Sequence, residues 1–365
     1  MTIEEDIKNI EDEIRKTPYN KATSHHIGRL KAKLARLRDE LQKRATAKSG
    51  GKGKGYAVKK SGDATVVMVG FPSVGKSTLL NCLTGTSAEV AAYDFTTLEV
   101  IPGTLLYKGA RIQFLDVPGL IQGAAAGRGH GKEVISVLRN ADLILIIVDV
   151  FHPQQFDTLV KELYDAGIRI NSKPPEVVIH KTSRGGITVN STVDLELAKK
   201  TIRAVLSEYK IHNADVLIRE RITLDELIDV VLGNRNYIPA LTVINKIDLA
   251  NSEALRRCME RFTDAIPISA AVGTNLDTLK NRIYDELRFI RIYMKPRGAS
   301  PDMGNPLVMR TDSTVADVCS TIHRDFINKF KYARIWGRSV KYGGQRVGLS
   351  HVLTDGDVLS IVVRK

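Results

Sequence analysis

The segment from Gly70 to Ser77 constrains the fold of this 365-residue chain more than any other feature. It reads Gly-Phe-Pro-Ser-Val-Gly-Lys-Ser, follows a strand-like apolar run at residues 65–69 and precedes a stretch that is expected to be helical from Lys76 onward. A glycine-rich turn between a strand and a helix offers backbone N–H groups and the positive end of the helix dipole to phosphates. The pattern therefore predicts a phosphate-binding loop, with Lys76 on the β- and γ-phosphates and Ser77 on Mg²⁺.

Beyond this loop, buried strands alternate with helical stretches, which is typical of an α/β fold with a mostly parallel sheet covered on both faces. The expected strands lie at residues 111–115, 143–148, 241–244 and 265–268. The connection from Phe151 to Pro239 is 89 residues long, far more than one crossover requires. Its expected strands lie at 176–181, 186–191 and 214–219, and its expected helices at 195–209 and 224–232. We interpret this span as an inserted α+β subdomain.

The two ends of the chain differ from the centre. Two isoleucine and leucine stripes at helical spacing, Ile3 to Ile14 and Ile27 to Leu41, predict a helical hairpin in which each helix buries its stripe against the other. The opposite face of the second helix carries Arg29, Lys31, Lys33, Arg36 and Arg38. Residues 291–365 predict a separate α+β module with a strand at 306–310, a helix at 315–330 and short strands beyond it.

Positive charge is concentrated at these ends. The formal net charge is +13, and residues 1–60 carry 16 Lys and Arg against 8 Asp and Glu, while residues 290–365 carry 13 against 6. Basic ends around a near-neutral centre indicate contact with a polyanion, which high salt should weaken. The alternative is a solvated basic surface without a partner.

Two further motifs follow predicted strands. Asp116-Val-Pro-Gly119 places a carboxylate where it can hold Mg²⁺ through water, and the Gly119 N–H where it can approach a γ-phosphate. In Asn245-Lys-Ile-Asp248, the Asp248 carboxylate can accept two hydrogen bonds from guanine, a pair that adenine does not offer. Asn245 is expected to brace the loop, the Lys246 stem to lie on the base, and a backbone N–H at Ser269-Ala270 to reach guanine O6.

Switch elements are predicted between and after these motifs. In Phe95-Thr-Thr-Leu98 we favour Thr97 over Thr96 as the residue that completes the Mg²⁺ shell and senses the γ-phosphate, with a β-prone Thr pair as the alternative. Leu120 stands where many related enzymes have a water-orienting glutamine, so intrinsic hydrolysis should be slow. Activation by a partner or a monovalent cation would follow from that.

Composition excludes several other classes. No apolar run reaches the ~18 residues that a membrane span needs, the N-terminus has no secretory pattern, and Cys82, Cys258 and Cys319 are too far apart for a disulfide framework or a zinc site. We expect a cytoplasmic protein with neither a membrane nor a DNA partner.

The motifs resemble those of the DRG (developmentally regulated GTP-binding protein) family within the Obg group of GTPases, and the similarity runs nearly end to end. The residues that carry it are the segments at 70–77, 95–98, 116–121 and 245–248, and, for the DRG branch, 20–24, 167–171 and 345–351. The resemblance implies a P-loop GTPase that hydrolyses GTP to GDP and phosphate, a C-terminal TGS domain of β-grasp fold, and association with translating ribosomes. Together with the basic ends of the chain, it leads us to expect docking on ribosomal RNA. It also implies stimulation by K⁺, although Ser73 stands where relatives have an asparagine, and eukaryotic members have a dedicated stabilising partner protein.

These observations give a definite set of expectations. The expected domains are a helical hairpin (1–47), a Gly/Lys linker (48–62), a GTPase domain (63–166 and 238–290), the insert (167–237) and the TGS domain (291–365). The residues expected to have a catalytic role are Lys76, Thr97 and Gly119, and those expected to bind metal are Ser77 and Thr97. The residues expected to contact nucleotide are Gly70, Phe71, Pro72, Ser73, Val74, Gly75, Lys76, Ser77, Thr78, Phe95, Thr96, Thr97, Asp116, Val117, Pro118, Gly119, Asn245, Lys246, Asp248, Ser269, Ala270 and Ala271.

Two other functions remain open from the residues alone. One is a nucleotide-gated RNA-binding scaffold with incidental hydrolysis, and the other, disfavoured by Asn245 and Asp248, is a P-loop kinase. For Trp336, which stands among Tyr332, Arg334 and Arg338, we favour packing in the core of the C-terminal module over stacking on an RNA base.

Overall fold

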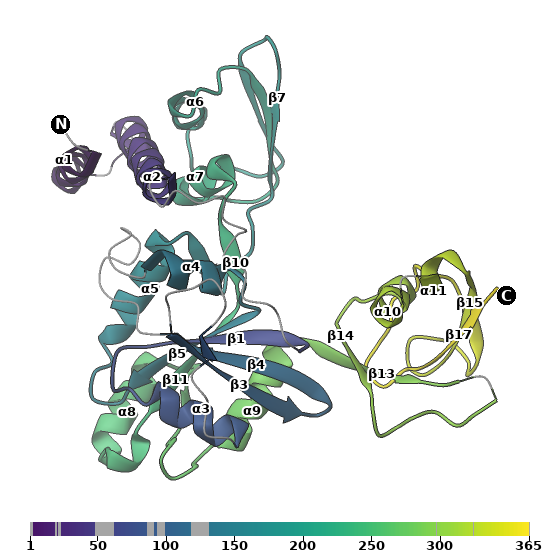
Figure 1. Cartoon of the computed structure of the whole chain (residues 1–365). Helices are drawn as coiled ribbons and strands as arrows, with labels where there is room; N and C mark the ends of the chain where they lie inside the picture. Colours follow the sequence, from purple (N-terminus) through teal and green to yellow (C-terminus); the bar gives the residue numbers. More distant parts are fainter. Residues whose placement is uncertain are drawn as a thin grey trace. The chain divides into compact units, whose positions relative to one another are not determined.

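The computed structural model describes residues 3–18, 20, 23–47, 62–85, 91–92, 99–117, 131–296, 298–323 and 325–364. These residues belong to two compact units, and Figure 1 labels many of their helices and strands. One unit is drawn from Met1–Tyr56, Ile121–Arg139 and Val160–Ile238, and the other from Ala57–Leu120, Asn140–Leu159 and Pro239–Lys365. No helix within the described ranges has the length and apolar character needed to cross a bilayer.

A seven-stranded sheet, in the order β12-β11-β5-β1-β4-β3-β2, organises the second unit. Its strands are β1 (Ala64–Val69), β2 (Ala91–Ala92), β3 (Glu99–Tyr107), β4 (Ala110–Asp116), β5 (Leu143–Asp149), β11 (Ala240–Asn245) and β12 (Ile266–Pro267). The five strands from β12 to β4 pair in parallel, so the predicted parallel sheet is confirmed. β3 and β2, which the sequence did not predict, extend the sheet antiparallel beside β4.

The central strands are buried along their whole length. Every residue of β1 and β5 is buried, which explains their almost uninterrupted apolar sequences. The helices that accompany this sheet are α3 (Lys76–Thr84), α8 (Ser252–Arg261) and α9 (Leu276–Glu286), with the short 3₁₀ helix η1 (Ile247–Leu249), while α5 (Gln155–Asp165) runs from this unit into the first. Because the strands are parallel, their carboxyl ends, where the motifs lie, share one edge of the sheet.

The first unit contains the N-terminal hairpin and the inserted segment. Its helices are α1 (Ile3–Lys16), α2 (Ser24–Ala47), α4 (Gly131–Arg139), α6 (Lys199–Glu208) and α7 (Leu224–Leu232). Its strands are β7 (Val177–Lys181), β9 (Ala214–Ile218) and β8 (Ile187–Ser191) in one sheet, and β10 (Asn236–Ile238) with β6 (Ile168–Ile170) in another. All the elements predicted for the insert are present, although α6 begins at Lys199, four residues later than predicted.

The predicted hairpin is confirmed. Ile10 of α1 and Leu30 and Leu37 of α2 form a buried apolar cluster, against which Ile3, Ile7, Ile14 and Leu34 pack. A second face of α2 packs on the insert, which the sequence did not indicate. Ala32 is fully buried in the insert core, and a Cβ built on Gly28 would lie 2.8 Å from Thr201 Cγ2 of α6. The small residues at 28 and 32 therefore let α2 approach α6 closely.

Three of the five cations on the basic face of α2 form ion pairs within the molecule. Lys31 Nζ lies 2.9 Å from Asp225 Oδ2, and Arg36 Nη2 lies 3.2 Å from Glu208 Oε1. Arg38 bridges Glu11 and Asp165, at 2.7 and 2.8 Å. Arg29 and Lys33 are exposed. The physical reason is that carboxylates of the insert (Asp225 and Glu208), of α1 (Glu11) and of α5 (Asp165) complement these cations.

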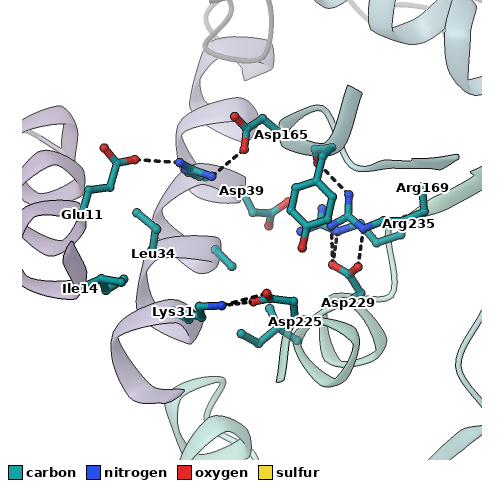
Figure 2. Close-up of a pocket in the computed structure, with 14 residues that line it drawn as sticks. Glu11, Ile14, Lys31, Leu34, Asp39, Asp165, Arg169, Asp225, Asp229 and Arg235 are labelled. Carbon is teal, nitrogen blue, oxygen red and sulfur yellow. Dashed lines mark hydrogen bonds and ion pairs between the residues drawn. The ribbon is translucent and has the colours of Figure 1, made fainter. Parts of the chain in front are cut away.

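A cavity of about 300 Å³ lies along this contact, lined by residues of α1, α2, α7 and the end of α5 (Figure 2). On its far wall Arg169 and Arg235 both pair with Asp229, as Figure 2 shows. Because these cations and carboxylates are paired with one another, we interpret the cavity as part of the interface between the hairpin and the insert.

Substitution of Gly28 by valine should disturb this contact. The added methyl groups would meet Thr201 and Leu224, so we expect a loss of about 1–3 kcal/mol in stability and weaker hydrogen-exchange protection in α2 and α6. Arg29→Val, at an exposed position of the same helix, is the matched control. Equal protection in the two variants would show that the close approach is unimportant.

The C-terminal residues form a five-stranded mixed sheet in the order β14-β13-β17-β15-β16. Its strands are β13 (Phe289–Met294), β14 (Leu307–Arg310), β15 (Phe330–Trp336), β16 (Gln345–Val347) and β17 (Val358–Val363), accompanied by α10 (Val315–Ile322) and α11 (Asp325–Asn328). The single helix predicted at 315–330 is wrong. His323 is extended, with φ −163° and ψ 134°, because the chain must turn so that Phe330 can pair with Val363 in the sheet.

The expectation that Trp336 packs in the core of this module is also wrong. Along β15, Ala333 and Ile335 are fully buried and point into the core, whereas Tyr332, Arg334 and Trp336 alternate onto the opposite face. The Lys295 ammonium lies 4.5 Å from the centre of the Trp336 ring. The tryptophan is therefore half-buried on the outer face of the sheet.

Candidate functional site

The predicted phosphate-binding loop connects β1 to α3, as its sequence requires. Gly75 precedes the helix with φ 94°, and Ser73 also has a positive φ of 63°. A Cβ on Gly70 would lie 2.6 Å from Ile147 O, and a Cβ on Gly75 would lie 2.4 Å from Asn245 Nδ2. A side chain at Gly70 or Gly75 would therefore collide with a residue of a neighbouring strand. At Gly75 the positive φ also favours glycine.

Lys76 folds back over this loop. Its Nζ donates hydrogen bonds to Gly70 O at 3.1 Å and Phe71 O at 3.2 Å, and the residue is only 9% exposed. Burial lowers the pKa of the Lys76 ammonium, while the charge of Asp116 opposes that shift. The loop therefore concentrates positive charge and N–H donors in a small space, as an anion site requires.

Ser77 and Asp116 lie next to each other although β2, β3 and most of β4 separate them in sequence. The Ser77 hydroxyl donates to Asp116 Oδ2 at 2.7 Å, and Asp116 is 6% exposed at the end of β4. Burial raises the pKa of the Asp116 carboxyl, although the Ser77 hydrogen bond and the Lys76 charge oppose the rise. A hydroxyl beside a carboxylate at a phosphate loop is an oxygen donor set that fits Mg²⁺.

The side chain of Asn245 joins two loops. Its Nδ2 donates to Val74 O at 2.8 Å and its Oδ1 accepts from Ala270 N at 3.0 Å, and the residue is 2% exposed. One amide thus ties the phosphate loop to the loop after β12. This is the bracing contact that its position after β11 led us to expect.

The residues expected to read guanine surround this brace. Asp248 lies exposed on η1, and no side-chain hydrogen bond to it is present among the described residues. The N–H groups of Ser269 and Ala270 are already used, by Thr274 O and by Asn245 Oδ1. Those two N–H groups therefore do not suit guanine O6, and the exposed Ala271 offers the remaining one of the three.

Asp149 is a site residue that the sequence reasoning missed. It ends β5 at the same sheet edge as Asp116 and Asn245, and the register of β5 and β11 places it beside Asn245. Its Oδ2 lies 3.6 Å from Lys246 Nζ. The available signal was an acidic residue closing an otherwise apolar strand.

Several expected site residues lie outside the described part of the chain. These residues are Phe95, Thr96, Thr97, Pro118, Gly119 and Leu120. The structure therefore brings together the phosphate loop, Ser77, Asp116, Asn245, Lys246, Asp248 and the 269–271 loop, and the remaining assignments stay predictions.

Family models match three consecutive parts of the chain. Residues 65–181 match the model described as a 50S ribosome-binding GTPase, and residues 184–289 match the model for the C-terminal region of that domain. Residues 290–363 match the TGS domain model. The chain is therefore a P-loop GTPase domain followed by a TGS domain, as the resemblance implied.

Relatives of full length are also found. An uncharacterized GTP-binding protein of Methanocaldococcus jannaschii is 57% identical, covering 100% of this chain and 94% of that protein. The developmentally-regulated G-protein 3 of Arabidopsis thaliana is 48% identical, and the ribosome-interacting GTPase 1 of Saccharomyces cerevisiae is 49% identical, each covering 99% of both chains. With GTPase and TGS domain matches and relatives of this similarity along its whole length, the chain belongs to the family of developmentally regulated GTP-binding proteins.

Proposed function

We propose that this protein hydrolyses GTP slowly and acts as a switch on ribosomes, in the cytoplasm. The observation that carries the proposal is the Asn245 side chain, which is bonded to both the phosphate loop and the loop after β12. These two hydrogen bonds fix the phosphate loop relative to the segment that carries Asp248, the carboxylate proposed to bind guanine. The name of the yeast relative, a ribosome-interacting GTPase, supports the choice of partner.

Each residue of the proposed site has a distinct task. Lys76 stabilises the γ-phosphate, Asp248 selects guanine, and Gly119 donates its N–H to the γ-phosphate. Ser77 and Thr97 would hold Mg²⁺, Asp116 would act on it through water, and the ion would neutralise phosphate charge. Lys76 is already held at the loop by two carbonyl oxygens, so the phosphates replace existing contacts of the ammonium.

Slow turnover follows from the residue after Gly119. The Leu120 side chain is apolar and cannot orient an attacking water, so activation must come from elsewhere. We propose K⁺ and the ribosome as activators, and a stabilising partner protein of the kind found in eukaryotic relatives. Ser73, within the phosphate loop, has an exposed side chain.

The outer face of the C-terminal sheet is the proposed surface for RNA. Tyr332, Arg334 and Trp336 alternate along β15, and the Arg346 guanidinium on β16 lies 4.6 Å from the centre of the Tyr332 ring. Unpaired RNA bases stack on aromatic rings and on guanidinium planes, and phosphates pair with the adjacent cations. This surface, more than the internally paired basic face of α2, therefore accounts for contact with ribosomal RNA.

GTP turnover titrated with ribosomes and with K⁺ tests the proposal. We expect low basal turnover that both additions raise, and sedimentation with ribosomes that is lost at high salt. Arg346→Glu should weaken sedimentation and ribosome stimulation without altering basal turnover, because Arg346 lies outside the nucleotide site. Arg256→Glu, at an exposed position of α8, is the matched control.

The same titration separates the second candidate, a nucleotide-gated RNA scaffold, which the aromatic and basic sheet face favours. A scaffold would sediment with ribosomes but show no stimulation of turnover. Absence of GTP hydrolysis under every condition would contradict the proposed switch.

A further inference from the structure

Asp149 ends β5 at the edge of the sheet where the proposed guanine-reading loop begins. Its side chain is 8% exposed, and its two oxygens have different partners. Oδ1 accepts hydrogen bonds from Phe151 N at 3.0 Å, His152 N at 2.9 Å and His152 Nδ1 at 2.9 Å. Oδ1 thus closes the turn after the strand, whereas Oδ2 lies 3.6 Å from Lys246 Nζ.

The backbone around Lys246 holds that residue in a defined place. Lys246 has φ 65°, a left-handed conformation uncommon for a residue with a side chain. Val150 N donates to Asn245 O at 3.1 Å, and Ile247 N donates to Ile268 O at 3.3 Å, so neighbouring strand ends clamp both sides of the lysine. The backbone direction is therefore set, and only the long side chain remains to be oriented.

Orientation of that side chain matters because a free lysine samples many rotamers. Confining such a side chain when a ligand binds lowers the affinity, and confining it beforehand avoids that loss. Asp149 is buried, and the Lys246 charge favours its ionised form, since it helps to lower the pKa of that carboxyl. Lys246 Nζ is accordingly drawn toward the end of β5 before any nucleotide arrives.

We propose that Asp149 is a positioning residue for Lys246. It orients the Lys246 side chain before the nucleotide binds, so that the methylene stem lines one side of the guanine pocket. This inference rests on the proposed function, because it requires that guanine occupies the space between Lys246, Asp248 and Ala271. It adds to that function a residue that contacts no part of the nucleotide. If Asp149 acted only through the hydrogen bonds of Oδ1 to residues 151 and 152, its role would be purely structural. The test must separate that role from the positioning of Lys246.

A double-mutant cycle between Asp149 and Lys246 makes that separation. Asp149→Asn keeps the shape and the Oδ1 acceptor but removes the charge that faces Lys246. Lys246→Met keeps the apolar stem and removes the ammonium. His152→Ala, which removes only the ring contact to Oδ1, is the matched control. The measurements are the Kd and dissociation rate of ribose-labelled fluorescent GDP and GTP with Mg²⁺, for the full chain.

We expect Asp149→Asn and Lys246→Met each to raise the Kd for GDP and for GTP by the same factor, about 3- to 10-fold, through faster dissociation. The double variant should bind no more weakly than Lys246→Met alone, and His152→Ala should stay within about twofold of the wild type. An equal effect on GDP and GTP is expected because Lys246 faces the base and not the γ-phosphate.

Several results would overturn this assignment. Two results would show that Asp149 does not act through Lys246, and both would leave the proposed function intact. One is an unchanged nucleotide affinity in Asp149→Asn. The other is a fold-change in Kd for the double variant that equals the product of the two single fold-changes. Should Asp149→Asn fail to fold, unchanged binding by Lys246→Met, whose side chain is 30% exposed, would overturn it instead. A wild-type protein that binds no guanine nucleotide would overturn the proposed function together with this inference.

Discussion

Replacing Asp248 by asparagine should lower the affinity for GTP by about 100- to 10 000-fold, since two hydrogen bonds to a charged group are each worth about 1.5–3 kcal/mol. The asparagine oxygen can accept one N–H of guanine, but its amide then faces the other donor. Xanthine presents an oxygen at that position, so XTP should bind the variant better than GTP. Competition of GTP and XTP against a fluorescent nucleotide measures both effects.

Asp277→Asn is the matched control for this substitution. Asp277 lies in α9 with its side chain 91% exposed, so its replacement should change neither GTP nor XTP binding. Asp248 is also exposed, and the variant should therefore melt at the temperature of the wild type. If Asp248→Asn retained full affinity for GTP, the assignment of the guanine site would be wrong.

Removal of Asp229 should give the largest loss of stability, about 3–5 kcal/mol, because it leaves two guanidinium groups without their counterion. Arg169 donates to Asp229 through Nε at 2.6 Å and Nη2 at 2.8 Å, and Arg235 Nε donates at 2.7 Å. The three side chains are between 5% and 14% exposed. Asp229→Ala should therefore lower the urea midpoint of the full chain and the hydrogen-exchange protection of α7.

A neighbouring ion pair supplies the control. Lys31 and Asp225 line the same cavity in Figure 2, but their side chains are 34% and 45% exposed. Solvent screens such a pair, so Asp225→Ala should cost only about 0–1 kcal/mol. Similar losses in the two variants would show that burial of the Asp229 pair is not what stabilises this unit.

The parts of the fold that the sequence predicted well are those with a strong local pattern. β1 and β5 are apolar throughout because both faces are covered, and the hairpin stripes repeat at helical spacing. The two-residue β2 carries no such pattern, and β3 includes Pro102 and Gly103, which weaken a strand prediction. The break at His323 has no glycine or proline to announce it, because pairing of β15 with β17 imposes it.

The site shows the same division. Lys76, Ser77, Asp116 and Asn245 were predictable because their spacing at strand ends reflects a chemical requirement for phosphate, metal and loop bracing. Asp149 was not predictable in the same way, since its partner Lys246 directly follows β11 and the contact depends on the register of β5 and β11. The pairing of Arg38 with Asp165 likewise joins distant segments, and a basic helix face alone does not reveal it.

The docking of α2 on α6 and α7 has a consequence for the order in which the newly made chain can fold. The hairpin precedes the insert in the chain, and the helices that cover Gly28 and Ala32 end only at Glu208 and Leu232. At a synthesis rate of about 5–20 residues per second, the small-residue face of α2 waits roughly ten to forty seconds for its partners. Because α1 packs on the leucine stripe and not on this face, completion of the N-terminal region is coupled in time to synthesis of the insert.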